Sequence, residues 1–141
     1  MSSVTSPNSP LAGRKVLVVE DEAIIAEAAL MMLQDAGAEA VGPCDSVSKA
    51  LNALEQSDID VALLDMDLKG MRSTAVMQTL VERGIPFVAA TGHTIAAAVG
   101  GAPVIISKPY TPQQMLAALE SALAASPHTA EIISLDDERC A

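Results

Sequence analysis

The sequence contains almost no aromatic residues and only two cysteines. Phe87 and Tyr110 are its only aromatics, so its core must be built from Ala, Val, Leu, Ile and Met. Hydrophobic residues nevertheless make up 50% of the 141 positions, which excludes an intrinsically disordered chain. Cys44 and Cys140 lie far apart, without the CxxC or Cys/His spacing of a metal site. This pattern argues against a disulfide scaffold or a zinc site and favours a reducing cytoplasm.

Basic residues and long apolar segments are also scarce. The chain has 8 Lys and Arg residues against 18 Asp and Glu residues, a formal net charge of −10. Because the phosphate backbone repels so acidic a chain, we expect no nucleic-acid partner. The longest uncharged apolar stretch, Ile95–Ile106, is too short to span a bilayer, and the polar residues 1–15 contain no signal-peptide segment. The sequence therefore predicts a cytoplasmic protein without membrane insertion.

Short apolar runs alternate with segments of helical spacing. Runs of about four residues that are apolar on both sides are typical of parallel strands covered on both faces. Four occur, at Val16–Val19, Val61–Leu64, Phe87–Ala90 and Val104–Ile106, with a weaker one at Ala38–Val41. Helical segments follow them, at residues 22–36, 47–54, 76–80, 94–99 and 112–123. The alternation predicts an α/β fold, a doubly wound five-stranded parallel sheet with helices on both faces.

Start and stop signals mark the predicted helices. Ser46 is a suitable N-cap for the second helix, and Thr111-Pro112-Gln113-Gln114 has the form of a capping box with Pro at the first helical position. Gly37 and Gly84 are suitable C-terminal stops. We expect one domain over residues 15–125, with an N-terminal tail at 1–14 and an acidic C-terminal tail at 126–141. No output domain is expected.

Polar side chains follow four of the predicted strands. Glu20 and Asp21 come after the first strand and Asp65 after the third, while Thr91 ends the fourth and Lys108 follows the fifth. In parallel sheets of this kind, ligands bind beyond the carboxyl ends of the strands. Any one of these residues alone would be ordinary, because polar side chains commonly follow strands at the solvent-exposed edge of a sheet. Together they form a chemically coherent set at one edge of the sheet.

The three carboxylates of this set indicate a cation site. Glu20, Asp21 and Asp65 would repel one another unless a cation lay between them. Mg²⁺ prefers oxygen ligands and keeps open positions for water or phosphate. Lys108 and the hydroxyl of Thr91 are suited to contact other phosphoryl oxygens. Asp65 is then a nucleophile that can form an aspartyl phosphate by in-line phosphoryl transfer.

The order of an acid pair, Asp, Thr and Lys-Pro along nearly the whole chain resembles the receiver domain of two-component response regulators. The resemblance implies a (βα)₅ flavodoxin-like fold and a signalling module rather than an enzyme, in which a histidine kinase or histidine phosphotransfer protein phosphorylates Asp65. It implies Mg²⁺ bound by Glu20, Asp21, Asp65 and the backbone carbonyl of Asp67. Thr91 would supply the hydroxyl of the switch, and Lys108 would be the lysine that these domains carry at the site. The Lys108–Pro109 peptide is usually cis in this family. A downstream protein target would receive the signal.

The chain departs from the family pattern at several points. Ile105 stands where the switch aromatic is expected, three residues before Lys108. The segment between Thr91 and Lys108 is short, which predicts a shortened fourth helix, and we expect phosphorylation to change hydrogen exchange mainly over residues 92–102. Ala89-Ala90-Thr91-Gly92 is similar to the Phe-Ala-Thr-Gly motif of a stand-alone subclass. His93 and Asp67 are expected to modulate dephosphorylation.

A different class of function stays open from the motifs alone. Asp65-Met66-Asp67 also resembles the Asp-x-Asp of haloacid-dehalogenase phosphatases and, with Glu20, the acids of Toprim nucleases. The alternative is therefore a magnesium-dependent phosphotransfer enzyme. Against the phosphatase, Asp65 ends the third strand rather than the first. Against the nuclease, a net charge of −10 leaves no basic patch for a nucleic acid.

Overall fold

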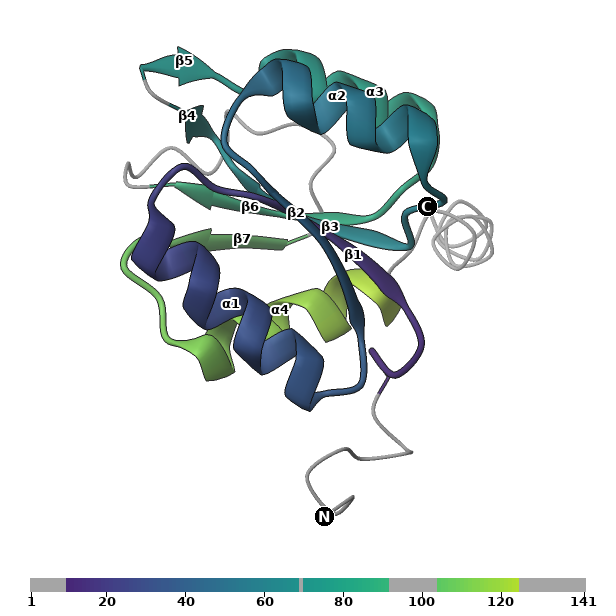
Figure 1. Cartoon of the computed structure of the whole chain (residues 1–141), viewed down its shortest axis with the longest axis vertical. Helices are drawn as coiled ribbons and strands as arrows, with labels where there is room; N and C mark the ends of the chain where they lie inside the picture. Colours follow the sequence, from purple (N-terminus) through teal and green to yellow (C-terminus); the bar gives the residue numbers. More distant parts are fainter. Residues whose placement is uncertain (1–9, 69, 92–103, 125–141) are drawn as a thin grey trace, which may run out of the picture.

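The computed structural model describes residues 10–68, 70–91 and 104–124. Its centre is a five-stranded sheet with the order β2-β1-β3-β6-β7, in which every pairing is parallel (Figure 1). The strands are β1 (Lys15–Val19), β2 (Glu39–Cys44), β3 (Val61–Asp65), β6 (Phe87–Thr91) and β7 (Val104–Ser107). All five predicted strands are confirmed. Four of them are one residue longer than the predicted run, whereas β2 begins one residue later than predicted and ends three residues beyond Val41.

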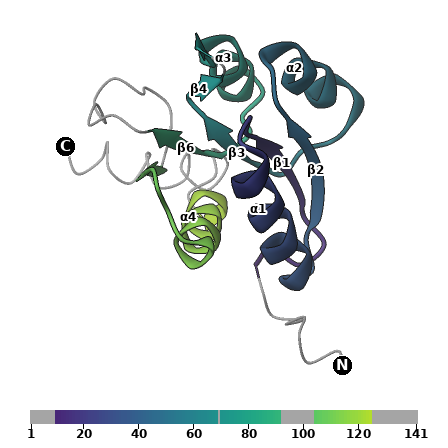
Figure 2. The same ribbon diagram turned by 60° about the vertical axis from the view of Figure 1, so that its left-hand side comes forward.

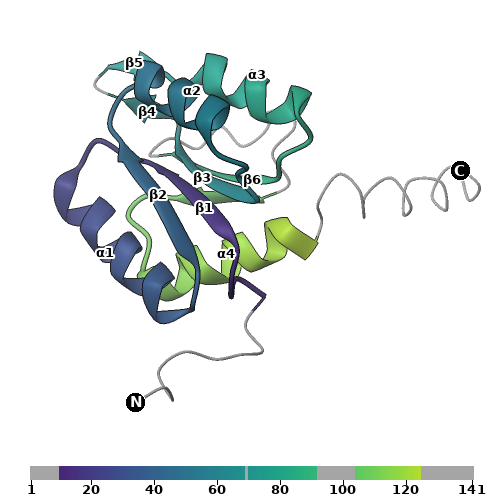
Figure 3. The same cartoon turned by 45° about the vertical axis from the view of Figure 1, so that its right-hand side comes forward.

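Helices cover both faces of the sheet, as the alternation predicts. Helices α1 (Ala23–Asp35) and α4 (Pro112–Ala124) lie on one face, and α2 (Val47–Gln56) and α3 (Thr74–Glu82) lie on the other (Figures 1 and 3). Figure 2 shows α1 and α4 side by side on their face. The fold is the doubly wound α/β arrangement expected. The predicted short helix at residues 94–99 lies outside the described residues.

The predicted helix ends are confirmed by hydrogen bonds and backbone angles. The Ser46 hydroxyl accepts a hydrogen bond from the Lys49 N–H at 3.2 Å. At the start of α4, the Gln114 N–H donates to the Thr111 hydroxyl at 3.0 Å, and the Thr111 N–H donates to the Gln114 side-chain oxygen at 2.8 Å. These reciprocal bonds form a capping box, which fixes where α4 begins after Lys108. Gly37 ends α1 with a φ of 85°, in the left-handed region that favours glycine.

The core consists of two apolar layers, one on each face of the sheet. The α1 and α4 layer includes Val16, Leu33, Leu63 and Leu119, and the α2 and α3 layer includes Leu17, Leu54, Leu64, Leu80 and Phe87. Leu11 also belongs to the first layer and is 0% exposed. The sequence predicts that the domain starts at position 15. The buried Leu11 shows that packed structure includes a residue four positions before it.

A two-stranded antiparallel hairpin, β4 (Asp67–Leu68) and β5 (Met71–Arg72), follows β3 directly. The sequence does not predict it, because strands of two residues show no periodicity.

Among the helices of the described ranges, none combines the length and the apolar character needed to cross a membrane.

Candidate functional site

The carboxyl edge of the sheet brings together residues from four strands. Glu20 directly follows β1, Asp65 ends β3, Thr91 ends β6 and Lys108 directly follows β7. Their convergence follows from the parallel register, in which Asp65 pairs with Ala90 and Thr91 pairs with Ser107. The sequence predicts this edge as the site because ligands of open α/β sheets bind there.

Three carboxylates form a cluster at this edge. One oxygen from each of Glu20, Asp21 and Asp65 lies within 4.8 Å of the other two. The Glu20 and Asp65 residues are each 2% exposed, whereas Asp21 is half-buried. Hard carboxylate oxygens at this spacing suit Mg²⁺, which binds through one or two carboxylates and keeps water in its other positions. The donor set therefore fits the predicted metal.

Lys108 is the cation that faces this cluster. Its Nζ lies 3.2 Å from Oδ2 of Asp65 and 3.5 Å from a carboxylate oxygen of both Glu20 and Glu22. Burial lowers the pKa of the ammonium, but the nearby Asp65 and Glu20 carboxylates outweigh it and raise the Lys108 pKa above its ordinary value. The group is therefore a permanent positive charge. The sequence did not predict Glu22 as a site residue, although it directly follows Glu20 and Asp21.

The surroundings of Glu20 shift the pKa of its carboxyl group. Burial raises the pKa of Glu20 to about 7 and the charge of Asp65 adds to the rise, while a backbone N–H bond and Lys108 oppose it. That bond is donated by the Glu22 N–H to Oε2 of Glu20, at 3.1 Å. Near neutral pH, Glu20 without a metal is therefore only partly ionised. A cation beside it would favour the carboxylate.

Backbone and hydroxyl groups hold the Asp65 segment in place. The Asp67 N–H donates to Oδ1 of Asp65 at 3.1 Å, and the Met66 N–H donates to the carbonyl of Ala90 at 3.0 Å. The hydroxyl of the fully buried Ser73 donates to the backbone carbonyl of Asp65. Ser73 is missing from the predicted site, and no sequence signal eight residues beyond Asp65 marks it. The bond from Asp67 orients the Asp65 carboxylate, and the other two hold the backbone around it.

The other predicted residues lie in β6 and β7 or outside the described residues. Thr91 is buried, and its backbone carbonyl accepts a hydrogen bond from the Lys108 N–H at 2.9 Å. Ile105 is half-buried in β7, where it packs against the α2 and α3 layer of the core. The Lys108–Pro109 peptide is cis, as the family resemblance implies. His93 lies outside the described residues.

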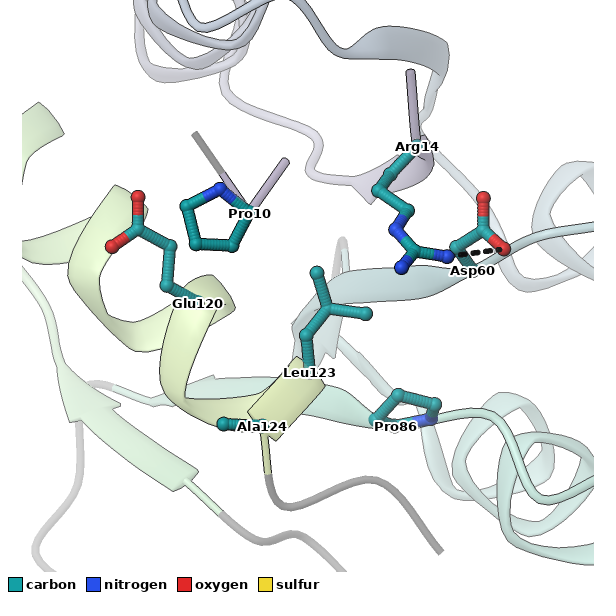
Figure 4. A pocket seen from close by; sticks show the side chains of 7 residues that line it. All are labelled: Pro10, Arg14, Asp60, Pro86, Glu120, Leu123 and Ala124. Carbon is teal, nitrogen blue, oxygen red and sulfur yellow. Dashed lines mark ion pairs between the residues drawn. The ribbon is translucent and has the colours of Figure 1, made fainter. Parts of the chain in front are cut away.

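Two cavities lie at opposite ends of the molecule. One of about 140 Å³ lies between α1 and α4 and is lined by apolar side chains and Tyr110, two residues after Lys108. The other, of about 470 Å³, is lined by residues before β1, β3 and β6 and at the end of α4, including Arg14, Asp60, Pro86 and Leu123 (Figure 4). Arg14 and Asp60 form an exposed ion pair of 4.0 Å there. None of the predicted site residues that the structure describes lines this second cavity.

Known proteins similar to this chain are response regulators and related signalling proteins. The family model of the response regulator receiver domain matches residues 16–120. Sensory transduction protein RegX3 of Mycolicibacterium smegmatis is 35% identical over 114 residues, 77% of this chain and 50% of that protein. DNA-binding response regulator MtrA of Mycolicibacterium paratuberculosis is 30% identical over 131 residues, 88% of this chain and 58% of that protein.

A solved structure shows the same fold over a comparable length. The solution structure of SdrG from Sphingomonas melonis Fr1 matches with a TM-score of 0.67 and 35% identity, covering 79% of this chain and 97% of that one. By contrast, the chain spans only about half the length of the curated relatives it matches. The similarity to those relatives therefore concerns only part of each of them.

Proposed function

We propose, for a chain that belongs to the family of response regulator receiver domains, that Asp65 is the phosphoacceptor of a phosphorylation-controlled signalling module. Family membership supports the signalling role, and the geometry of the site supports the choice of residue. The observation that carries it is the Asp65 carboxylate, which is buried at the end of the central strand β3, beside two further carboxylates and 3.2 Å from Lys108.

Mg²⁺ is the cofactor that we propose for this site. Glu20, Asp21 and Asp65 would hold it, and the backbone carbonyl of Asp67 would complete the protein ligands. When bound, Mg²⁺ neutralises the carboxylates and the phosphoryl oxygens that approach them. Without that charge, the cluster would repel an anionic donor, because in the described ranges a single ammonium, that of Lys108, pairs with Glu20, Glu22 and Asp65.

The proposed reaction moves a phosphoryl group from a histidine of a partner protein to Asp65. A carboxylate oxygen of Asp65 attacks phosphorus, the new O–P bond forms as the P–N bond breaks, and the imidazole leaves. Lys108 would neutralise one phosphoryl oxygen, and the Thr91 hydroxyl would donate to another. Asp67 and His93 are proposed to modulate the later hydrolysis by water.

The phosphodonor is proposed to be a histidine kinase or a histidine phosphotransfer protein, and the recipient of the signal a downstream protein target. The relative MtrA is named as DNA-binding, but this chain matches only 58% of its length. With a net charge of −10, we still expect this chain to bind no nucleic acid. The cytoplasmic location indicated by the cysteine pattern also stays a prediction.

The family match does not support the haloacid-dehalogenase-like or Toprim-like alternative. In our proposal the chain acts on no external substrate, and its chemistry is limited to its own phosphorylation and dephosphorylation. Incubation with acetyl phosphate and Mg²⁺ tests this directly. Intact-mass spectrometry should show one added phosphoryl group per chain, and Asp65→Asn should abolish it.

Asp67→Asn is the matched control, because it makes the same chemical change two residues away and leaves Asp65 intact. It should still be labelled. Undiminished labelling of Asp65→Asn would overturn the assignment of the phosphoacceptor. Turnover of many acetyl phosphate molecules per chain, without accumulation of a phosphorylated species, would favour the enzyme alternative.

A further inference from the structure

The hydroxyl of Tyr110 is buried without a hydrogen-bond partner. Within the described part of the chain, it is the one buried side-chain polar atom in that condition. A buried hydroxyl left unpaired is unfavourable, so a state that supplies an acceptor is favoured over one that does not. Tyr110 lies two residues beyond Lys108, at the entrance to α4.

The surroundings of Tyr110 place it between the acidic site and the groove on the α1 and α4 face. Four charged groups act electrostatically on the phenol: Glu20, Glu22, Asp65 and Lys108. Burial and these carboxylates raise the pKa of Tyr110 to about 12, so the phenol is a protonated donor at neutral pH. Its ring also lines the cavity of about 140 Å³, with Ile24 and Ile25 of α1 and with Pro112 and Met115 of α4.

Phosphorylation would change which of these groups can accept a hydrogen bond. Lys108 is only a donor. In the proposed phosphorylated state, Asp65 carries the phosphoryl group and Glu20 faces the metal. Among these carboxylates, the one bound neither to the phosphoryl group nor to the metal is Glu22, an exposed residue at the N-terminal end of α1 that is 3.5 Å from Lys108. Movement of Lys108 toward a phosphoryl oxygen would leave this carboxylate without its cation.

We propose that the Tyr110 hydroxyl links occupancy of the Asp65 site to the groove between α1 and α4, by donating a hydrogen bond to Glu22 once Lys108 contacts the phosphoryl group. This inference rests on the proposed function. A bound group can shift a conformational equilibrium only through contacts that differ between two states, and this hydrogen bond is such a contact. A shift of the Tyr110 ring would reshape the groove beside Ile24 and Ile25. Tyr110 is thus a positioning residue, whereas Ile105 has no polar group for that role.

The test uses beryllofluoride with Mg²⁺ as the stand-in for the phosphoryl group on the full chain. Tyr110→Phe removes the hydroxyl and keeps the ring. Because the variant loses a bond made only in the occupied state, its dissociation constant for beryllofluoride should rise about tenfold. The urea midpoint of the unoccupied protein should rise as well, since an unpaired buried hydroxyl has been removed.

Two further variants separate this role from simple packing. Met115→Leu alters the same groove without a change in hydrogen bonding, and its affinity should stay within about twofold of the wild type. Glu22→Ala removes the proposed acceptor, so adding Tyr110→Phe to it should change the affinity no further. A merely structural role for Tyr110 would give the same loss in both backgrounds.

Three further results would overturn part or all of the proposed role of Tyr110. Equal beryllofluoride affinity in the wild type and Tyr110→Phe would overturn the role of Tyr110 alone, with the phosphorylation proposal intact. An undiminished effect of Tyr110→Phe in the Glu22→Ala background would overturn Glu22 as the acceptor. A wild type that binds no beryllofluoride and takes no phosphoryl group from acetyl phosphate would overturn the proposed function together with this inference.

Discussion

The ammonium of Lys108 lies 3.2 Å from Oδ2 of Asp65, although β6 separates their strands in the sheet. The contact depends on the parallel register of β3, β6 and β7, which brings the carboxyl ends of three strands to one level. Lys108 also lies 3.5 Å from Glu20 and from Glu22. Among the residues that the structure describes, this one ammonium therefore pairs with three carboxylates, and their excess negative charge favours a divalent cation.

Asp21→Ala is predicted to weaken Mg²⁺ binding about tenfold or more, roughly 1.4 kcal/mol. Asp21 supplies one of the three clustered oxygen ligands, and Mg²⁺ gives up its water shell only for well-placed oxygens. Calorimetric titration of the purified protein with MgCl₂ measures the effect. Asp35→Ala, an exposed acid at the far end of α1, serves as the control and should leave the affinity unchanged. An equal affinity in Asp21→Ala would place the metal elsewhere.

Glu20→Gln is predicted to stabilise the metal-free protein at pH 8 but not at pH 4. Burial raises the folded-state pKa of Glu20 from 4.5 to about 7, so folding favours its protonated form. The stability due to Glu20 is therefore fully present below pH 4.5 and is lost as the pH rises to about 7. Above that pH, the variant should gain on the order of 2 kcal/mol. Urea unfolding in EDTA at both pH values measures this, and a pH-independent difference would contradict it.

The strands and helix caps could be predicted because their signals are local. Four solidly apolar runs mark buried parallel strands, and the capping box at Thr111–Gln114 needs only four adjacent residues. The edge where Glu20, Asp65, Thr91 and Lys108 meet follows from the strand order alone. These residues were predictable because topology, rather than side-chain packing, brings them together.

Tertiary packing decides the features that the sequence did not reveal. Leu11 lies in a polar, Pro- and Ser-rich segment with only Ala12 as an adjacent hydrophobic residue, so no periodicity indicates that it is buried. The contact of Ser73 with Asp65 depends on the β4–β5 hairpin, which returns the chain to the end of β3. The position of Tyr110 beside the acids depends on how α4 packs against α1. Such contacts arise between elements and have no sequence period.

Leu11→Ala is predicted to destabilise the protein by about 2–5 kcal/mol, the usual range for a buried leucine in a packed core. Leu11 is 0% exposed and packs in the α1 and α4 layer. Urea unfolding monitored by circular dichroism measures the change. Met31→Ala is the control, because Met31 is 65% exposed and its truncation should alter stability by less than about 0.5 kcal/mol. Equal stabilities for the two variants would show that residues 10–14 are dispensable for packing.

Ile24→Asn is predicted to slow phosphoryl transfer from a protein donor about tenfold while leaving labelling by acetyl phosphate unchanged. Ile24 is 83% exposed and lies four residues after Glu20, on the rim of the groove between α1 and α4. An exposed apolar residue in the first turn of the helix that follows the acid pair is suited to contact the surface of a protein that delivers the phosphoryl group. The loss of one such contact weakens association by on the order of 1–2 kcal/mol. Met31→Asn makes a matched change further along the same helix and should transfer at the wild-type rate. The measurement is rapid-quench transfer from whichever purified histidine kinase of the same organism phosphorylates the wild type fastest. Equal rates for Ile24→Asn and the wild type would place the donor on another face, and a parallel loss with acetyl phosphate would show that Ile24 supports the site itself.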